Sequence, residues 1–165
     1  MPGGTPWQMK TAVSTGEIST VTASADFHHS PPFTTMSAFT YTRRIAFHET
    51  DAAGIVYYAN YFRLAEEAET HALASLGHAD SLRSYGYPRV HTEADYHSPL
   101  RFFDTVQVQA RITRIGASSL HWEFTISGPQ GLAATVRSIS ARRQLSNGAA
   151  APYSEAERAA LERLF

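Results

Sequence analysis

The feature that most constrains the fold is one long helical pattern, which is preceded by one strand pattern and followed by four. Residues 58–77 repeat apolar side chains every three or four positions, as a helix with one buried face does, and the repeat stops at Gly77. A helix of this length measures about 30 Å, which is enough to cross a small sheet. One long helix among several strands favours an α+β fold, in which the helix covers one face of the sheet.

Five segments alternate apolar and polar side chains, as half-buried strands do. They are residues 38–47, 88–97, 104–115, 118–127 and 132–145. Gly116, Gly128 and Gly131 mark short turns between the last three segments, which predicts hairpins and an antiparallel five-stranded sheet. Strands of this length should curl around the helix. In the last segment the alternation shifts between Val136 and Ile139, and this shift predicts a β-bulge.

The chain divides into three parts. Residues 1–36 are predicted to be a disordered tail, because eleven of the first 35 residues are Ser or Thr and no apolar periodicity holds. Residues 37–147 are predicted to form the folded domain. Residues 148–165 are predicted to be a C-terminal extension with a short helix, which opens with a capping box of Ser154 and Glu157. Met36 leads directly into the first strand pattern, so we expect it to be the natural start, or residues 1–35 to be dispensable.

Composition excludes several classes of protein. The net charge is −1, so overall electrostatics give no indication of binding to nucleic acid or to a membrane surface. No apolar run reaches the ~18 residues of a membrane span. The absence of cysteine excludes a disulfide scaffold, a thiolate nucleophile and a cysteine-ligated metal. The histidines show no HExxH or similar spacing, so we predict no metal site. The first residues do not form a secretory signal, and we expect a cytoplasmic protein.

The connection between the first strand pattern and the helix is the best candidate for chemistry. Asp51 lies in this loop, Gly54 closes it, and Tyr58 falls at the predicted helix start, where backbone N–H groups are free. A carboxylate beside such donors can attack a carbonyl or activate water while an N–H stabilises the oxyanion. From the residues alone, a purely structural role for Asp51 in an Asx-turn stays open.

Two stretches resemble the 4-hydroxybenzoyl-CoA thioesterase family. His48–Phe62 follows the family pattern of an acid, a small residue, Ala-Gly, two aliphatic residues, two aromatic residues and Asn-Tyr-Phe. Tyr96–Asp104 is similar to the family's strand-turn-strand segment, and the resemblance covers roughly residues 38–145. It implies a hotdog fold, in which the sheet wraps around a central helix. It also implies an acyl-CoA thioesterase, which hydrolyses a thioester to free acid and CoA.

The resemblance assigns roles to several residues. Asp51 falls on the family's catalytic acid, as nucleophile or general base, and the N–H near Tyr58 would polarise the thioester carbonyl. Glu66 follows fifteen residues later on the predicted apolar face of the helix, and would assist catalysis or read the acyl group. Glu69, on the same face, is a weaker candidate, and Glu49 is expected at the edge of the loop or pocket. The expected substrate-binding residues of the loop are Gly54, Ile55, Val56 and Tyr57, and the Tyr58 side chain is a further candidate for lining the acyl pocket.

Arginine supplies 13 of the 14 basic residues, and its planar head suits the phosphates of CoA. Arg101 is the strongest candidate, and the others are Arg137, Arg142 and Arg143. Solvated charges at the sheet edge are the alternative for all four.

The resemblance also implies which substrate, cofactor and oligomeric state to expect. It implies a small-molecule acyl-CoA substrate with an aromatic or otherwise compact acyl group, no separate cofactor, and a homo-oligomer, either a dimer or a tetramer of paired dimers. Two alternatives remain at this point. One is a thioesterase that acts on acyl carrier protein thioesters, and the other is a non-catalytic hotdog protein that binds a ligand.

Overall fold

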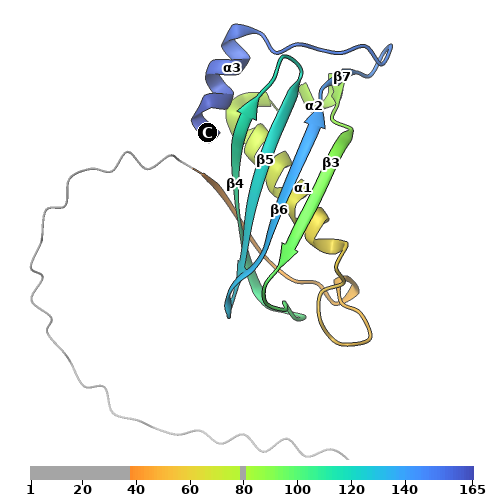
Figure 1. Ribbon diagram of the computed structural model, residues 1–165, viewed down its shortest axis with the longest axis vertical. Helices are drawn as coiled ribbons and strands as arrows, with labels where there is room; N and C mark the ends of the chain where they lie inside the picture. Colours follow the sequence, from red (N-terminus) through yellow and green to blue (C-terminus); the bar gives the residue numbers. More distant parts are fainter. Residues whose placement is uncertain (1–37, 79–80) are drawn as a thin grey trace, which may run out of the picture. The chain divides into compact units, whose positions relative to one another are not determined.

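The computed structural model describes residues 38–78 and 81–165 (Figure 1), so the predicted tail at residues 1–36, with Met36, lies outside the described residues. The elements are, in chain order, β1 (Phe39–Arg44), η1 (Phe47–Glu49), α1 (Asn60–Leu73), η2 (Ala74–His78), α2 (Ser81–Ser84), β2 (Tyr85–Gly86), β3 (Arg89–Tyr96), β4 (Thr105–Ile115), β5 (Ser119–Gly128), β6 (Gly131–Ala141), β7 (Arg143–Gln144), α3 (Glu155–Leu161) and η3 (Glu162–Leu164).

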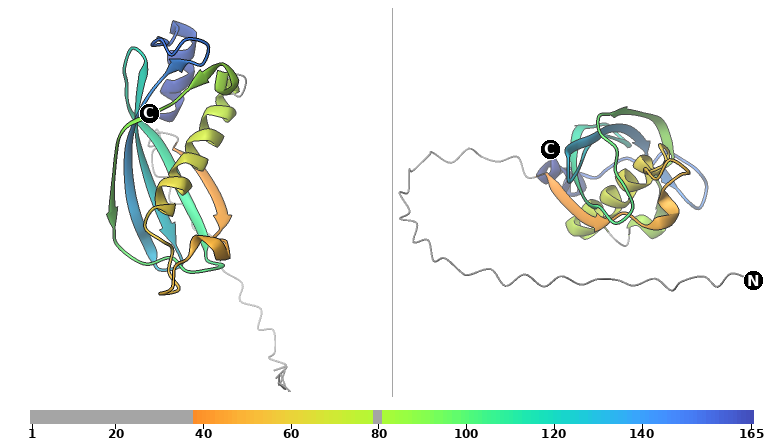
Figure 2. Two further views of the ribbon diagram at one scale, coloured as in Figure 1. Left: turned by 90° about the vertical axis from the view of Figure 1, so that its right-hand side faces the viewer. Right: turned by 90° about the horizontal axis from the view of Figure 1, so that it is seen from below.

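Five strands form one antiparallel sheet in the order β1-β4-β5-β6-β3. The sheet curls around α1, as the view along the helix in Figure 2 shows. The predicted five-stranded sheet wrapped around a long helix is therefore confirmed. β4, β5 and β6 follow one another as hairpins, as expected. β3, however, does not pair with β4, which follows it in the chain, but with β6 at the opposite edge of the sheet.

The connection between β3 and β4 explains this strand order. The chain leaves β3 at Tyr96 and enters β4 at Thr105. On the way, the Leu100 carbonyl accepts a hydrogen bond from the N–H of Val56 at 2.8 Å, and the Asp104 carbonyl accepts one from the N–H of Ile45 at 2.9 Å. The connection is thus tied to the Asp51 loop and to the end of β1. It leads from the edge strand β3 to β4, which lies beside the other edge strand, β1.

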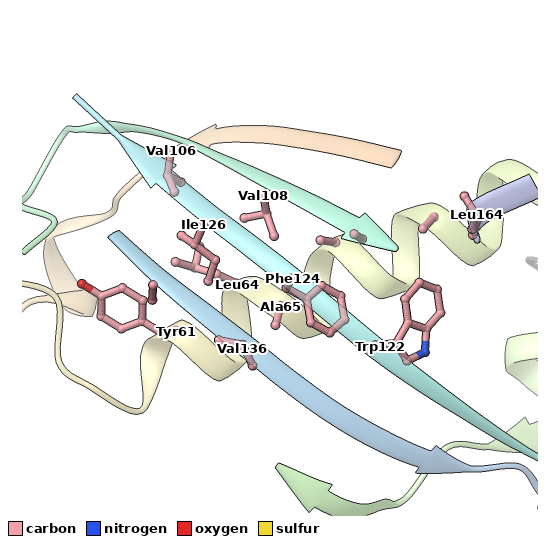
Figure 3. Close-up of a cluster of buried hydrophobic side chains, with 14 of the residues drawn as sticks. Tyr61, Leu64, Ala65, Val106, Val108, Trp122, Phe124, Ile126, Val136 and Leu164 are labelled. Carbon is pink, nitrogen blue, oxygen red and sulfur yellow. The ribbon is translucent and has the colours of Figure 1, made fainter. Parts of the chain in front are cut away.

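The core lies between α1 and the concave face of the sheet (Figure 3). Leu64 and Ala65 of the helix meet Val108, Phe124 and Val136 of the sheet. Each large side chain buried there contributes roughly 1.5–3 kcal/mol to folding. Buried and exposed residues alternate along β4 from Thr105 to Thr113, which agrees with the predicted strand pattern, because alternate side chains point to opposite faces of a sheet.

The predicted β-bulge between Val136 and Ile139 is wrong. Val136, Ser138 and Ser140 are all buried, so the strand keeps its alternation through this region. The apolar pattern changes because two serines occupy the buried face, not because the register changes. The irregularity of β6 lies earlier, at Ala133, where the pairing with β5 slips by one residue.

Helix α1 begins at Asn60, two residues later than predicted, and continues after Leu73 as the π turn η2. Gly77 has a φ of 82°, which confirms its predicted role as the residue that ends the helix. Glu69 is buried, whereas Glu66 is exposed, so the prediction that Glu66 shares the apolar face is wrong. No helix within residues 38–78 and 81–165 has the combination of length and apolar character that a membrane span requires.

The C-terminal segment packs into the same core. The predicted capping box is confirmed, since the Ser154 hydroxyl accepts from the N–H of Glu157 at 3.3 Å and the Glu157 carboxylate accepts from the N–H of Ser154 at 2.7 Å. Leu161 and Leu164 of the last turns are buried.

A buried arginine holds this segment to the rest of the fold. The Arg142 guanidinium carbon lies 3.7 Å from the ring centroid of Tyr85 and 4.7 Å from that of Tyr153, and Nη2 donates to Glu157 at 2.6 Å. We call Tyr85, Arg142, Tyr153 and Glu157 the C-terminal clamp. Because the Arg142 side chain is only 2% exposed, the prediction that it is available for a phosphate is wrong.

Candidate active site

Asp51 lies in a tight loop whose ends pair with each other. Thr50 and Val56 form a β-bridge, the N–H of Asp51 donates to the Ile55 carbonyl at 2.9 Å, and Gly54 turns the chain at a φ of 72°. One carboxylate oxygen of Asp51, Oδ1, accepts from the N–H of Ala53 at 2.8 Å, so the Asx-turn considered from the sequence is present. The other oxygen accepts no hydrogen bond from any residue that the structure describes. The exposed carboxylate is thus oriented by one oxygen and free at the other.

A buried ion pair anchors this loop to the strand and the helix. The Glu49 carboxylate, 7% exposed, accepts from Arg43 Nη1 at 2.8 Å and from the N–H of Ala46 at 2.7 Å. Arg43 also donates through Nε to Glu67 of α1 at 2.7 Å. The bond from Arg43 holds the pKa of Glu49 below its usual range. Glu49 lies in η1, within the connection between β1 and α1 as expected, but it is a buried structural anchor and not a pocket-edge residue.

Hydrogen bonds on both sides of Tyr58 hold its backbone in place. The Glu49 carbonyl accepts from the N–H of Tyr57 at 2.9 Å and from the Asn60 side chain at 2.8 Å. The Tyr58 carbonyl accepts from the Tyr96 hydroxyl at 3.2 Å. The N–H of Tyr58 itself donates to no residue in the described part of the chain. Tyr58 precedes α1 instead of lying in its first turn, yet it presents the free, fixed donor that oxyanion stabilisation requires.

Asp51 and Tyr58 line one cavity of about 400 Å³, which is large enough for a small-molecule ligand. The expected residues Ile55, Val56 and Tyr57 also line it, whereas Gly54 shapes the loop without lining the cavity. Segment 96–99 also lines the cavity, and its Tyr96 was not singled out from the sequence.

Aromatic side chains give this cavity its character. The rings of Tyr57 and Tyr58 lie 4.6 Å apart, and those of Tyr61 and Tyr96 lie 5.2 Å apart edge to face. Burial raises the pKa of Tyr61, so its hydroxyl stays neutral and accepts from the N–H of Leu100 at 3.4 Å. The cavity therefore combines apolar aromatic walls with one free carboxylate oxygen and one free backbone donor.

The two helix carboxylates lie elsewhere. Glu66 lines a separate cavity of about 140 Å³, with Phe62 and Ser138 among its neighbours, and does not line the Asp51 cavity of its own chain. Glu69 is 3% exposed and pairs with Arg89, whose Nη1 lies 2.9 Å from Oε1 and Nη2 2.8 Å from Oε2. Burial raises the pKa of Glu69, while Arg89 opposes this rise. Glu69 thus has a structural partner.

The arginines proposed for CoA phosphates differ in how free they are. The Arg101 side chain is exposed, and its guanidinium pairs with no described acidic residue, although its backbone forms a bridge with Ile55 of the Asp51 loop. Arg137 already donates to Glu93 at 3.2 Å, Asp95 at 3.1 Å and Glu123 at 3.2 Å. Arg101 is therefore the better placed of the two for a phosphate.

Within residues 38–78 and 81–165, no group of three or more His, Asp or Glu side chains is arranged to hold a metal ion.

Comparison with known proteins adds a family to this geometry. Residues 53–134, a stretch that begins two residues after Asp51 and includes Tyr58 and all of α1, match the thioesterase superfamily. The 1,4-dihydroxy-2-naphthoyl-CoA hydrolase of Synechococcus elongatus is 32% identical over 111 residues, which cover 63% of this chain and 80% of the relative.

Solved structures agree with that match. A 1,4-dihydroxy-2-naphthoyl-CoA thioesterase from Synechocystis superposes with a TM-score of 0.65 at 26% identity, over 76% of this chain and 96% of the other. A gentisyl-coenzyme A thioesterase superposes with a TM-score of 0.68 at 28% identity, over 74% and 98%. These similarities confirm the predicted hotdog fold. The narrower assignment to the 4-hydroxybenzoyl-CoA thioesterase family stays a prediction.

Proposed function

The chain belongs to the thioesterase superfamily, and from this premise we propose that it hydrolyses aromatic acyl-CoA thioesters in the Asp51 cavity. One observation carries the proposal: a carboxylate with a free oxygen, Asp51, and a backbone N–H with no partner among the described residues, Tyr58, line the same aromatic cavity. Two relatives with solved structures are named for aromatic thioesters, which supports the choice of acyl group.

The chemistry follows from these two groups. The thioester carbonyl oxygen would accept from the N–H of Tyr58, which stabilises the negative charge that develops as the carbonyl is attacked. Asp51 acts either as the general base that takes a proton from the attacking water, or as the nucleophile that forms an anhydride, which water then hydrolyses. Both routes end with the acyl carboxylate and the CoA thiol. In both, the bond between Asp51 Oδ1 and the N–H of Ala53 orients the reacting carboxylate.

Glu66 requires a second copy of the chain to act in this site. Within one chain it lines a different cavity from Asp51, so it reads the acyl group only if a partner subunit brings its own α1 to the mouth of the Asp51 cavity. We therefore propose a homo-oligomer, a dimer or a tetramer of dimers, with Glu66 hydrogen-bonded to a polar substituent of the acyl group. Sedimentation equilibrium tests this directly, and a mass of one chain at micromolar concentration would contradict it.

Thiol release from a panel of CoA thioesters tests the reaction and ranks the acyl group. The panel pairs benzoyl-CoA with 4-hydroxybenzoyl-CoA and adds hydroxynaphthoyl-, hexanoyl- and palmitoyl-CoA. Because the chain has no cysteine, a thiol reagent reports only the CoA that is released. We expect hydroxylated aromatic thioesters to be hydrolysed fastest. Turnover of the same acyl groups on acyl carrier protein, with none on CoA, would instead favour the carrier-protein alternative.

The variant Glu66→Gln tests whether Glu66 contacts the acyl group. Glu66→Gln keeps the shape of the side chain and removes its charge, and Glu66 is exposed, so the fold should be unaffected. We expect the preference for 4-hydroxybenzoyl-CoA over benzoyl-CoA to shrink, with little change in the rate for benzoyl-CoA. An unchanged preference would remove Glu66 from the acyl site.

A further inference from the structure

Three exposed phenylalanines lie together beside the Asp51 loop. Phe47, Phe102 and Phe103 are 76%, 52% and 59% exposed. The ring centroids of Phe47 and Phe102 lie 5.7 Å apart at 89°, and those of Phe102 and Phe103 lie 5.7 Å apart. We call these three residues the aromatic platform. A contiguous exposed apolar patch of this kind marks a binding surface more often than a packing accident.

The platform is held in place by the turn that carries it. The Asp104 carboxylate accepts from the N–H of Arg101 at 2.8 Å, and the N–H of Phe103 donates to the Ile45 carbonyl at 3.0 Å. Phe103 has a φ of 72°, and it is the one non-glycine residue of the described chain with a positive φ. A bulky side chain adopts this backbone conformation only against a steric cost, and such strain persists chiefly where function requires it.

Two free cations flank the platform. The Arg44 guanidinium carbon lies 4.2 Å from the centroid of the Phe103 ring, and the Arg44 and Arg101 side chains are both exposed. Neither guanidinium forms an ion pair with a residue that the structure describes. A purely apolar occupant would leave both cations without a counter-charge. Exposed aromatic faces beside free guanidinium groups instead match a ligand that has a flat ring and phosphates.

The platform is continuous with the Asp51 cavity. Arg101 forms a β-bridge with Ile55, which lines that cavity, and Leu100 accepts a hydrogen bond from Val56 of the same wall. Phe102 of the aromatic platform therefore directly follows a residue, Arg101, that is paired with the cavity wall. In a CoA thioester, the pantetheine arm joins the reacting carbonyl to a nucleotide at the far end of the molecule. A thioester whose carbonyl sits at Asp51 can extend this arm along the wall toward the platform.

From these observations we propose that the aromatic platform, with Arg44 and Arg101, binds the 3′-phosphorylated ADP end of CoA. The adenine ring stacks on the exposed faces of Phe102 and Phe103, and the two guanidinium groups pair with the phosphates. The proposal rests on the proposed function and deepens it, because it selects CoA over a carrier protein. A carrier protein presents the same pantetheine arm without a nucleotide.

Two substrates with the same acyl group test the proposal, the acyl-CoA and the acyl-pantetheine that lacks the nucleotide. We expect Phe102→Ala to raise the KM for the acyl-CoA by about tenfold, in line with the stacking of one base, and to leave kcat unchanged. The KM for the acyl-pantetheine should not change. Phe165→Ala is the matched control, because Phe165 is a 41% exposed aromatic residue outside the platform. A rise in KM that is equal for both substrates, or no rise for either, would overturn the nucleotide subsite.

A binding measurement keeps this test separate from the reaction. Isothermal titration with adenosine 3′,5′-bisphosphate should detect binding to the wild-type protein, with weaker binding to Phe102→Ala and to Arg44→Gln and unchanged binding to Phe165→Ala. If the wild-type protein hydrolysed neither substrate but bound this nucleotide at the platform, the proposed reaction would fail and the subsite would stand. Binding that is unaffected by Phe102→Ala and Arg44→Gln would overturn the subsite even in an active enzyme.

Discussion

The C-terminal clamp and the Asp51 loop use the same kinds of residue in opposite ways. In Figure 1 the clamp lies near β7 and α3, and the loop lies at the other end of α1. At the clamp, Arg142 is 2% exposed, stacks between two tyrosines and pairs with Glu157. At the loop end, by contrast, Asp51 and Arg101 are exposed, and the aromatic rings of the platform face solvent.

The difference shows how burial decides what a charged side chain does. At the clamp, stacking and the Glu157 carboxylate compensate for taking a guanidinium out of water, and a desolvated cation–π contact contributes about 2 kcal/mol. The clamp therefore contributes to stability. At the loop end, polar groups keep unused hydrogen-bonding capacity that a substrate can take up. The Glu49–Arg43 pair is the exception at that end, because it is buried and holds the reactive groups in place.

Removal of the free backbone N–H of Tyr58 should lower activity severely. Tyr58→Pro removes the backbone N–H, and loss of one oxyanion donor lowers kcat by roughly 10²–10³-fold. Tyr58→Phe, which keeps the N–H, is the control and should retain most of the activity. Steady-state kinetics on both variants, with circular dichroism to verify folding, makes the comparison. Equal activity in the two variants would show that this N–H is not the oxyanion donor.

Removing the acid of the clamp should affect stability instead of activity. Glu157→Gln leaves Arg142 buried without a counter-charge, and we expect a loss of about 2 kcal/mol, less than for a fully buried pair because Glu157 is 24% exposed. Urea unfolding measures this loss. Glu162→Gln, an exposed acid in the last turn, should change little. If Glu157→Gln were as stable as Glu162→Gln, the clamp would not stabilise the fold.

The same pair predicts a pH dependence. The hydrogen bond from Arg142 lowers the pKa of Glu157 from 4.5 to about 2 in the folded protein. The stability that this bond contributes is complete above pH 4.5 and is lost as pH falls through 2, because protonation then removes the charge from the folded state. The stability advantage of the wild type over Glu157→Gln should therefore shrink between these two pH values. An advantage that stays constant over this window in urea titrations would contradict the assigned pKa.

The smallest effect is expected at Arg137, on the solvent side of the sheet. Its guanidinium is 44% exposed and shared among three carboxylates, and exposed pairs of this kind contribute about 0–1 kcal/mol. Arg137→Gln should therefore lower stability only slightly. It should also raise the KM for acyl-CoA less than Arg101→Gln does, because Arg101 has no ion-pair partner among the described residues. A larger rise for Arg137→Gln would reverse the ranking of the two arginines.

The sequence predicted those structural features that depend only on residues near one another in the chain. Alternation in β4 and β5, the end of the helix at Gly77 and the capping box at Ser154 all depend on near neighbours, and all were predicted. The position of Asp51 in a closed loop also followed from its motif.

Features set by distant contacts were not predictable in this way. Helical spacing alone did not decide which of Glu66 and Glu69 is buried, because Glu69 enters the core only with Arg89 of β3 beside it. Arg142 was predicted to be a surface charge because its local sequence gives no sign of the two tyrosines, from distant segments, that pack against its guanidinium. Likewise, the bulge predicted in β6 assumed that the buried face is apolar, whereas two serines occupy it.

Whether the Asp51 carboxylate is the reacting group is tested by the rate of CoA release by wild type and Asp51→Asn, measured side by side on the fastest aromatic thioester. The substitution keeps the side-chain oxygen that accepts from the N–H of Ala53 and removes the charge, so the thermal melts should coincide. We expect kcat to fall by about 10²–10⁴-fold, the contribution of a general base, or by more if Asp51 is the nucleophile. Equal rates from two folded proteins would contradict this expectation, and the reacting group would then have to be sought outside the Asp51 loop.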